Sequence, residues 1–119
     1  MDKECDFFDM CCSSVWVRGI SFRNIPENTI FNGDSVYFEA DPDNEYHKEK
    51  YPDSVAVKIY ARDIFIGYIP AELCSYFAQL DIESAEVASI KEEDGKLIAV
   101  ELYIYADAFL PRQTRLEKV

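Results

Sequence analysis

The stretch that decides the fold is SVAVKIYARDIFIGYI, residues 54–69, in which two strand-like runs follow each other closely. Residues 54–61 and 64–69 are rich in β-branched and aromatic side chains, the composition of β-strands. Only Arg62 and Asp63 separate the two runs, and a connection of two residues is the length of a tight hairpin turn. The segment therefore predicts an antiparallel hairpin.

A short helix is expected directly after this hairpin. Pro70 suits a first helical turn, because its missing N–H would have no partner there, and Glu72 complements the helix dipole. Leu73, Phe77 and Leu80 then recur at helical spacing. The pattern predicts one short amphipathic helix.

Four further runs have the composition of strands, namely residues 15–22, 35–40, 84–91 and 96–105. The last two flank a turn-like stretch at residues 92–95. In the final run, alternate apolar residues share one face that we expect to be core: Ile98, Val100, Leu102 and Ile104. Residues 41–53 are polar and contain two prolines, so they are expected to form the longest loop.

The resulting order is four strands, one helix and two strands. This order predicts a mainly β fold, a small closed barrel of about six strands with one short helix between strands 4 and 5. No repeat or linker divides the chain. We expect an N-terminal extension at residues 1–14, the barrel domain at residues 15–105 and a C-terminal tail at residues 106–119.

Length and composition agree with one globular domain. The chain has 119 residues, and its 49% hydrophobic and 14% aromatic content excludes a disordered class of protein. No apolar run approaches the roughly 20 residues that a membrane-spanning helix needs. The first residues lack the basic and apolar regions of a signal peptide, so a soluble, cytoplasmic protein is expected.

The charge is strongly acidic. Twelve basic and 23 acidic side chains leave a formal net charge of −11 at pH 7. Most DNA-binding proteins gain affinity from Lys and Arg that displace counterions, so broad non-specific duplex binding is disfavoured. Local attraction is still compatible with this charge, because charges beyond about 8 Å are largely screened at physiological salt. An acidic surface that only maintains solubility is the alternative.

Neither a metal centre nor an active site is expected. The four cysteines, Cys5, Cys11, Cys12 and Cys74, contain no Cys-x-x-Cys pair and fall outside the usual zinc spacings, so buried or incidental thiols are expected. Cys74 falls within the predicted helix, where a free thiol acts as a small hydrophobe. His47 is the only histidine and lies in the predicted loop, where a surface position is expected. Without a phosphate-binding glycine loop either, we predict no cofactor, no metal and no catalytic residue.

An ordered set of short motifs nevertheless resembles a known family. Gly19 is followed by Phe22, then by an Asp-Pro-Asp-Asn loop at residues 41–44, an Asp-Ser-Val-Ala-Val strand start at residues 53–57 and Ile-Gly-Tyr-Ile-Pro-Ala-Glu-Leu at residues 66–73. In order and spacing this set is similar to the HIRAN family, over about residues 15–105. The stretch at residues 66–73 is its most specific part.

The resemblance implies a fold and a ligand. HIRAN domains form a small OB-like β-barrel with helices, and they occur fused to fork-remodelling helicases or as stand-alone bacterial or phage proteins. The best understood example binds single-stranded DNA at its free 3′-hydroxyl end, which places the family in DNA repair and processing. By position, Asp53 would accept a hydrogen bond from the hydroxyl and Phe22 would stack on the terminal base. Asn44 would form the pocket wall, and Tyr68 would contact the backbone.

The chain also departs from the family pattern. Residues of about 45–52 are extra between Asn44 and Asp53, and Tyr46 or Tyr51 would replace the tyrosine that usually precedes the aspartate. Ser21 stands where the DNA-binding example has an arginine. The predicted DNA-binding residues are Ser21, Phe22, Asn44, Tyr46, Tyr51, Asp53 and Tyr68.

Two functions of different classes follow. The first is a non-catalytic module that recognises single-stranded DNA ends, with Asp53 selecting a hydroxyl over a phosphate. The second is an acidic protein-interaction module that has kept the barrel, lost DNA binding and docks a basic, DNA-processing partner. A DNA-end hydrolase is the weakest alternative, since its metal cluster cannot be assembled from these residues.

Overall fold

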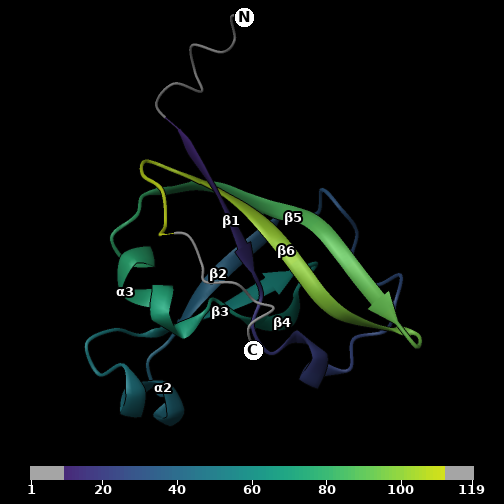
Figure 1. Ribbon diagram of the computed structural model, residues 1–119, viewed down its shortest axis with the longest axis horizontal. Coiled ribbons are helices and arrows are strands. Elements are labelled where there is room, and N and C mark those ends of the chain that lie inside the picture. Colours follow the sequence, from purple (N-terminus) through teal and green to yellow (C-terminus); the bar gives the residue numbers. More distant parts are fainter. Residues whose placement is uncertain (1–9, 112–119) are drawn as a thin grey trace, which may run out of the picture.

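A computed structural model describes residues 10–111 as two antiparallel three-stranded sheets (Figure 1). One sheet has the order β1-β6-β5, with β1 at Cys11–Trp16, β6 at Lys96–Ala106 and β5 at Ile82–Glu93. The other has the order β2-β3-β4, with β2 at Val36–Asp41, β3 at Ala56–Ala61 and β4 at Ile64–Tyr68. The mainly β prediction is confirmed.

Short helices fill the connections between strands. They are the 3-10 helix η1 (Ile20–Arg23), α2 (Glu45–Lys50), the 3-10 helix η2 (Ala71–Leu73) and α3 (Cys74–Phe77). The helix expected between the fourth and fifth strands is confirmed, as η2 followed by α3, and Cys74 within it is buried. Within residues 10–111, no helix has the length and apolar character needed to cross a membrane.

The prediction of a loop at residues 41–53 is wrong, because this segment contains α2. Asn44 caps the helix: its side-chain oxygen accepts a hydrogen bond from the backbone N–H of His47 at 2.9 Å. Glu45 in the first turn and Lys50 in the last complement the helix dipole. A six-residue helix with mostly polar side chains has little periodicity to reveal it, but this cap is a recognisable start signal.

The predicted hairpin is confirmed. Arg62 and Asp63 both have positive φ, 51° and 64°, as a two-residue type I′ turn requires. Asp94 and Gly95 form the corresponding turn between β5 and β6, with φ of 54° and 80°.

The first strand lies earlier than predicted. Residues 15–22 do not form one strand: β1 covers Cys11–Trp16, and Gly19, with φ 82°, turns the chain into η1. Leu110 is buried, and its N–H donates to the buried Ser13 hydroxyl at 2.8 Å. Residues on both sides of the predicted domain boundaries therefore belong to the fold, while residues 1–9 and 112–119, including Cys5, lie outside the described residues.

The last strand forms much of the core, with one correction. Val100, Leu102 and Ile104 are fully buried as predicted, but Ile98 is only partly buried and Leu97 takes the core position. The ladder explains the change, since Lys91 pairs with Ala99 and Glu92 with Leu97. This bulge leaves Ile98 unpaired and shifts the alternation by one residue.

The two sheets meet at both edges, but the closed barrel expected from the strand order is not found among residues 10–111. At one edge, the backbones of Arg18 and Tyr68 exchange hydrogen bonds of 2.8 and 2.9 Å. The approach requires Gly67, with φ 153°, because a Cβ there would lie 2.5 Å from the Arg18 carbonyl oxygen and from a Val17 methyl carbon.

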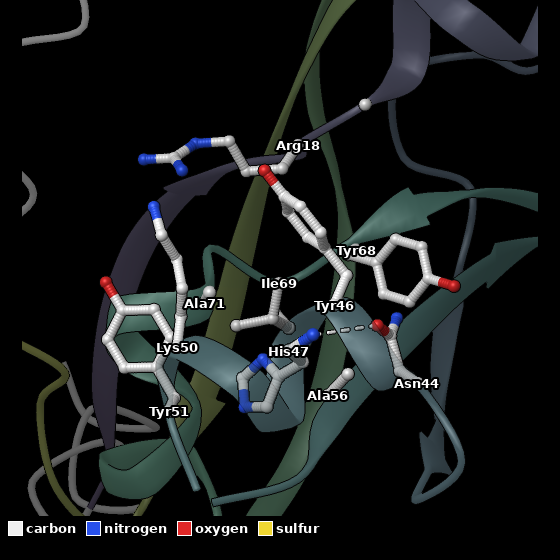
Figure 2. Close-up of a pocket in the computed structure, with 11 residues that line it drawn as sticks. Arg18, Asn44, Tyr46, His47, Lys50, Tyr51, Ala56, Tyr68, Ile69 and Ala71 are labelled. Atoms are coloured by element: carbon white, nitrogen blue, oxygen red, sulfur yellow. Dashed lines mark hydrogen bonds between the residues drawn. The ribbon is translucent and has the colours of Figure 1, made fainter.

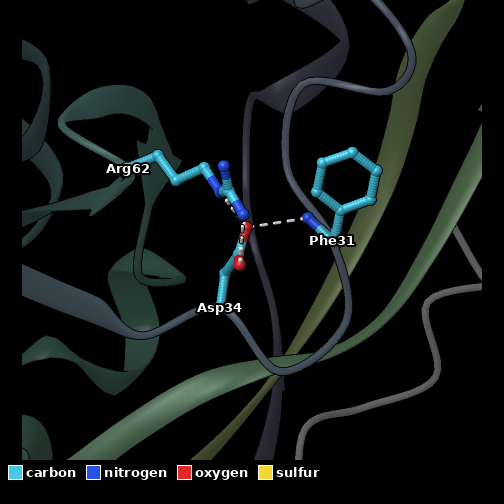
Figure 3. Close-up of polar contacts among 3 residues, drawn as sticks. All are labelled: Phe31, Asp34 and Arg62. Carbon is cyan, nitrogen blue, oxygen red and sulfur yellow. Dashed lines mark hydrogen bonds and ion pairs between the residues drawn. The ribbon is translucent and has the colours of Figure 1, made fainter.

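At the opposite edge, Asp34 connects the sheets. Its backbone oxygen accepts the N–H of Val87 in β5 at 2.9 Å. Its carboxylate accepts the N–H of Phe31 at 2.8 Å and the Nε and Nη2 of Arg62 at 2.8 and 3.2 Å (Figure 3). The arginine lowers the pKa of Asp34 below its ordinary value of 3.8. The turn between β3 and β4 is thereby tied to the other sheet.

Candidate nucleic-acid interface

A cavity of about 270 Å³ lies where the first edge junction meets α2 (Figure 2). Its walls come from residues 18–19, from Asn44 and α2, from the end of β4 and from Ala71. Ile69, which is 1% exposed, also lines it and provides an apolar surface. The cavity therefore draws on segments distant in sequence that only the folded chain brings together.

Helix α2 contributes aromatic and basic side chains. Tyr46, Lys50 and the capping residue Tyr51 all line the cavity. His47 anchors them: it is 6% exposed, its Nε2 lies 2.8 Å from the Ser54 hydroxyl, and its ring centre lies 5.5 Å from that of Tyr51. The expected surface position of His47 is wrong, because α2 turns this residue inward.

Tyr68 stands at the end of β4, opposite the helix. Its hydroxyl donates to a carboxylate oxygen of Asp41 at 3.1 Å. Burial first, and this hydrogen bond second, raise the pKa of Tyr68, so the phenol stays protonated at neutral pH. Its ring remains only partly buried and lines the cavity.

Two cations accompany the tyrosines. Arg18 and Lys50 line the cavity, and in Figure 2 their side chains extend toward the same side. Arg18 donates to Glu72 at 2.8 Å, and both side chains of this pair are more than 40% exposed, 45% and 42%. Such an exposed pair contributes little to stability, so the guanidinium can exchange its partner for an anion at low cost.

The cavity unites four of the seven predicted residues: Asn44, Tyr46, Tyr51 and Tyr68. Ser21, Phe22 and Asp53 do not line it. Ser21 and Phe22 lie in η1, two and three residues after the lining residue Gly19, and the Phe22 side chain is 83% exposed. Asp53 is exposed in a turn closed by the Ser54 N–H and the Tyr51 oxygen at 3.2 Å. Each of the three therefore lies two or three residues from a lining residue along the chain.

The candidate residues taken from the sequence omitted both cavity cations. Lys50 could have been found from the Asn44 cap, which predicts a helix that places residues 46, 47 and 50 on adjoining positions of one turn. Arg18 has no local signal, because its place depends on the backbone pairing with Tyr68.

The thiols and acids of residues 10–111 show neither a disulfide nor a metal-binding group. Cys11, Cys12 and Cys74 are free, and burial raises the pKa of Cys74 to about 11, which keeps it a neutral thiol. Among residues 10–111, no group of three or more His, Cys, Asp or Glu side chains is arranged to hold a metal ion.

Comparison with known proteins finds no matching family model, no matching curated protein and no matching solved structure. The resemblance to the HIRAN family, and the ligand that it implies, therefore stay predictions.

Proposed function

We propose that this protein is a non-catalytic module that binds single-stranded DNA and recognises its 3′ end. The observation that carries the proposal is the cavity in which Tyr46, Tyr51 and Tyr68 stand beside Arg18 and Lys50. Aromatic faces bind unstacked bases of any sequence, and the basic groups supply partners for the phosphates that flank them.

The size of the cavity suits the end of a strand. Its volume of about 270 Å³ is close to the lower limit of small-molecule pockets, roughly 300–1,000 Å³. Arg18 and Lys50 would take the place of the arginine that the family example carries at the position of Ser21. A terminal nucleotide needs few phosphate contacts, which is compatible with a protein whose net charge is −11.

Asp53 supports selection of a hydroxyl end. A carboxylate accepts a hydrogen bond from a free 3′-hydroxyl and repels a phosphate at the same place. Asp53 is exposed two residues after Tyr51, so it is available to a strand end that enters beside that ring.

The proposal includes the OB-like form of the fold. In this interpretation, the isolated bridges Arg18–Tyr68 and Ser35–Glu86 are the closure points of a barrel that runs through both sheets. The cavity would then lie at a closure point, where the two sheets come together.

Fluorescence anisotropy with short oligonucleotides tests the function. We expect a 3′-hydroxyl strand to bind about tenfold more tightly than the same strand with a 3′-phosphate, given the ~1.5–3 kcal/mol of a charged hydrogen bond. Asp53→Asn should abolish this preference, and Lys50→Gln should weaken both strands. Lys91→Gln, at an exposed position on β5, is the matched control and should change neither. Equal binding of the two strands by the unmodified protein would contradict end recognition.

The second candidate is the acidic protein-interaction module. The charge of −11 and the exposure of Phe22 (83%) and Tyr46 (76%) favour it. Affinity purification that returns a stable basic partner, together with no detectable oligonucleotide binding, would establish this function in place of the first.

A further inference from the structure

The outer face of the β2-β3-β4 sheet carries an aromatic row, made of Tyr37, Tyr60, Phe65 and Tyr68. Along β3, Val57, Ile59 and Ala61 are buried, so the alternation turns Tyr60 outward. Tyr60 pairs with Tyr37 on β2 and with Phe65 on β4, which places the three rings on one face.

A bulge adds the fourth ring. Phe65 and Tyr68 are three residues apart and would face opposite sides of a regular strand. Here Ile59 pairs with Gly67 and Tyr60 with Phe65, which leaves Ile66 as the extra residue on β4. Both aromatic side chains therefore reach the outer face, and Ile66 is fully buried.

The rings of the aromatic row touch in sequence across the sheet. Tyr37 and Tyr60 are stacked, with centroids 5.2 Å apart and planes 7° apart. Tyr60 and Phe65 are 5.7 Å apart, and Phe65 meets Tyr68 edge-on at 5.3 Å. Tyr37 is 49% exposed and the other three are partly buried, so ring surface is open to solvent along the row.

Cations stand over the middle of the row. The guanidinium carbon of Arg23 lies 4.2 Å from the Phe65 ring centre, and the Lys58 ammonium lies 5.2 Å from it. Of the eight Lys and Arg side chains within residues 10–111, four border the row or the cavity: Arg18, Arg23, Lys50 and Lys58. In an acidic protein this grouping is a local attraction for phosphates.

Acidic side chains also lie on this face. Glu39 is opposite Lys58 in the strand register, and Asp63 accepts the Tyr37 hydroxyl at 2.9 Å. Asp41 accepts the Tyr68 hydroxyl. Arg23 and Lys58 are the cations that lie over the Phe65 ring, and Arg23 is the nearer of the two.

Tyr68 belongs to both the aromatic row and the cavity, so the two surfaces are continuous. We propose that the aromatic row binds the nucleotides that precede the strand end, with their bases on the rings and their phosphates near Arg23 and Lys58. This inference rests on the proposed function, and it extends the site from one terminal nucleotide to a strand that crosses β4, β3 and β2.

A length series tests the row separately from the cavity. The probes are thymidine oligonucleotides of two, four and eight residues, each with a 3′-hydroxyl or a 3′-phosphate. We expect the affinity of the unmodified protein to rise with length, because each stacked base adds affinity, by about fivefold or more.

Two variants test whether the aromatic row causes the increase in affinity with oligonucleotide length. Tyr37→Leu keeps an apolar side chain at the far end of the row and should lower the affinity of the longest strand about tenfold, with the shortest strand unchanged. Tyr60→Leu should shorten the effective site further. Tyr103→Leu is the matched control, because this tyrosine is 39% exposed on β6 of the other sheet. Thermal unfolding of each variant verifies that it is folded.

The outcomes separate the two proposals. A length dependence that Tyr37→Leu removes, with the hydroxyl preference intact, supports the aromatic row. A hydroxyl preference without length dependence overturns the row alone. Length dependence without a hydroxyl preference overturns end recognition and keeps the row. No binding of any oligonucleotide, or equal losses in Tyr103→Leu and Tyr37→Leu, overturns the inference.

Discussion

The outer faces of the two sheets differ in chemistry, although both sheets bury apolar inner faces against one another. On the β1-β6-β5 sheet, carboxylates hold the hydroxyls: Glu101 accepts hydrogen bonds from Ser14 and, at 2.9 Å, from Ser89, and Glu86 accepts the Tyr105 hydroxyl at 3.2 Å. The Lys and Arg residues of these three strands are Lys91 and Lys96, both beside the turn between β5 and β6. Over the rest of this face the carboxylates predominate, which disfavours phosphates.

On the outer face of the β2-β3-β4 sheet, the aromatic row and the cations Arg23 and Lys58 lie where the other sheet has carboxylates and hydroxyls. The inner residues of both sheets are constrained by packing, since each must fill the shared core. The outer residues have no such constraint, so their chemistry is the better guide to function. The difference is the reason to place the proposed binding on one face of the molecule.

The largest predicted effect comes from breaking the junction that holds the two sheets together at the cavity. Gly67→Ala places a Cβ 2.5 Å from the Arg18 carbonyl oxygen in a backbone conformation that disfavours side chains. We expect a loss of about 2–5 kcal/mol in the free energy of unfolding, from strain and overpacking together. Urea denaturation measures it.

Gly95→Ala is the control for this change. Gly95 also has positive φ, 80°, but a Cβ there meets nothing within 4 Å. Its expected cost is that of the backbone alone, about 1 kcal/mol. Equal losses in the two variants would show that the close approach of the sheets is not what requires Gly67.

The second prediction concerns the difference in charge between the outer faces of the two sheets, measured by the salt dependence of oligonucleotide affinity. The affinity for a single strand should fall with salt by about 0.7 in log K per log salt for each phosphate contacted. Lys58→Gln should reduce that slope by about 0.7, the value for one lost phosphate contact. Tyr37→Leu should lower the affinity without changing the slope. Lys91→Gln on β5 should leave both values unchanged, and a slope change there would contradict the assignment of binding to the β2-β3-β4 sheet.

The smallest effect concerns the other junction between the sheets. Because Arg62 lowers the pKa of Asp34 below 3.8, the pair contributes stability above that pH and loses it as the pH falls through the lowered pKa. The urea midpoint should therefore fall slightly more between about pH 5 and pH 2 in the unmodified protein than in Asp34→Asn. Identical pH profiles would show that the pair does not stabilise this edge.

The fold could largely be predicted where it depends on local signals. The two-residue turn at Arg62 and Asp63 determines its hairpin, and Pro70 marks the helix that follows. Bulges escaped prediction, since the extra residues at Ile66 and Ile98 depend on how neighbouring strands pair rather than on their own sequence.

In the candidate site, too, the residues close together in sequence could be predicted and those joined by strand pairing could not. Asn44, Tyr46 and Tyr51 meet in the cavity because they lie on or beside one short helix. Arg18 joins them through backbone pairing with Tyr68, a contact between residues 50 positions apart that periodicity does not show. The aromatic row was missed for the same reason, because Phe65 and Tyr68 share a face only through the bulge at Ile66.

Amide NMR during titration with a 3′-hydroxyl oligonucleotide tests the central assignment most directly. We predict that shift changes concentrate in α2, at residues 18–23 and along β2, β3 and β4, with Tyr37, Lys58, Phe65 and Tyr68 among the affected residues. Outward positions of the β1-β6-β5 sheet, such as Ser14 and Tyr103, should stay unchanged. Shift changes confined to that sheet, or none at saturating oligonucleotide, would contradict the account.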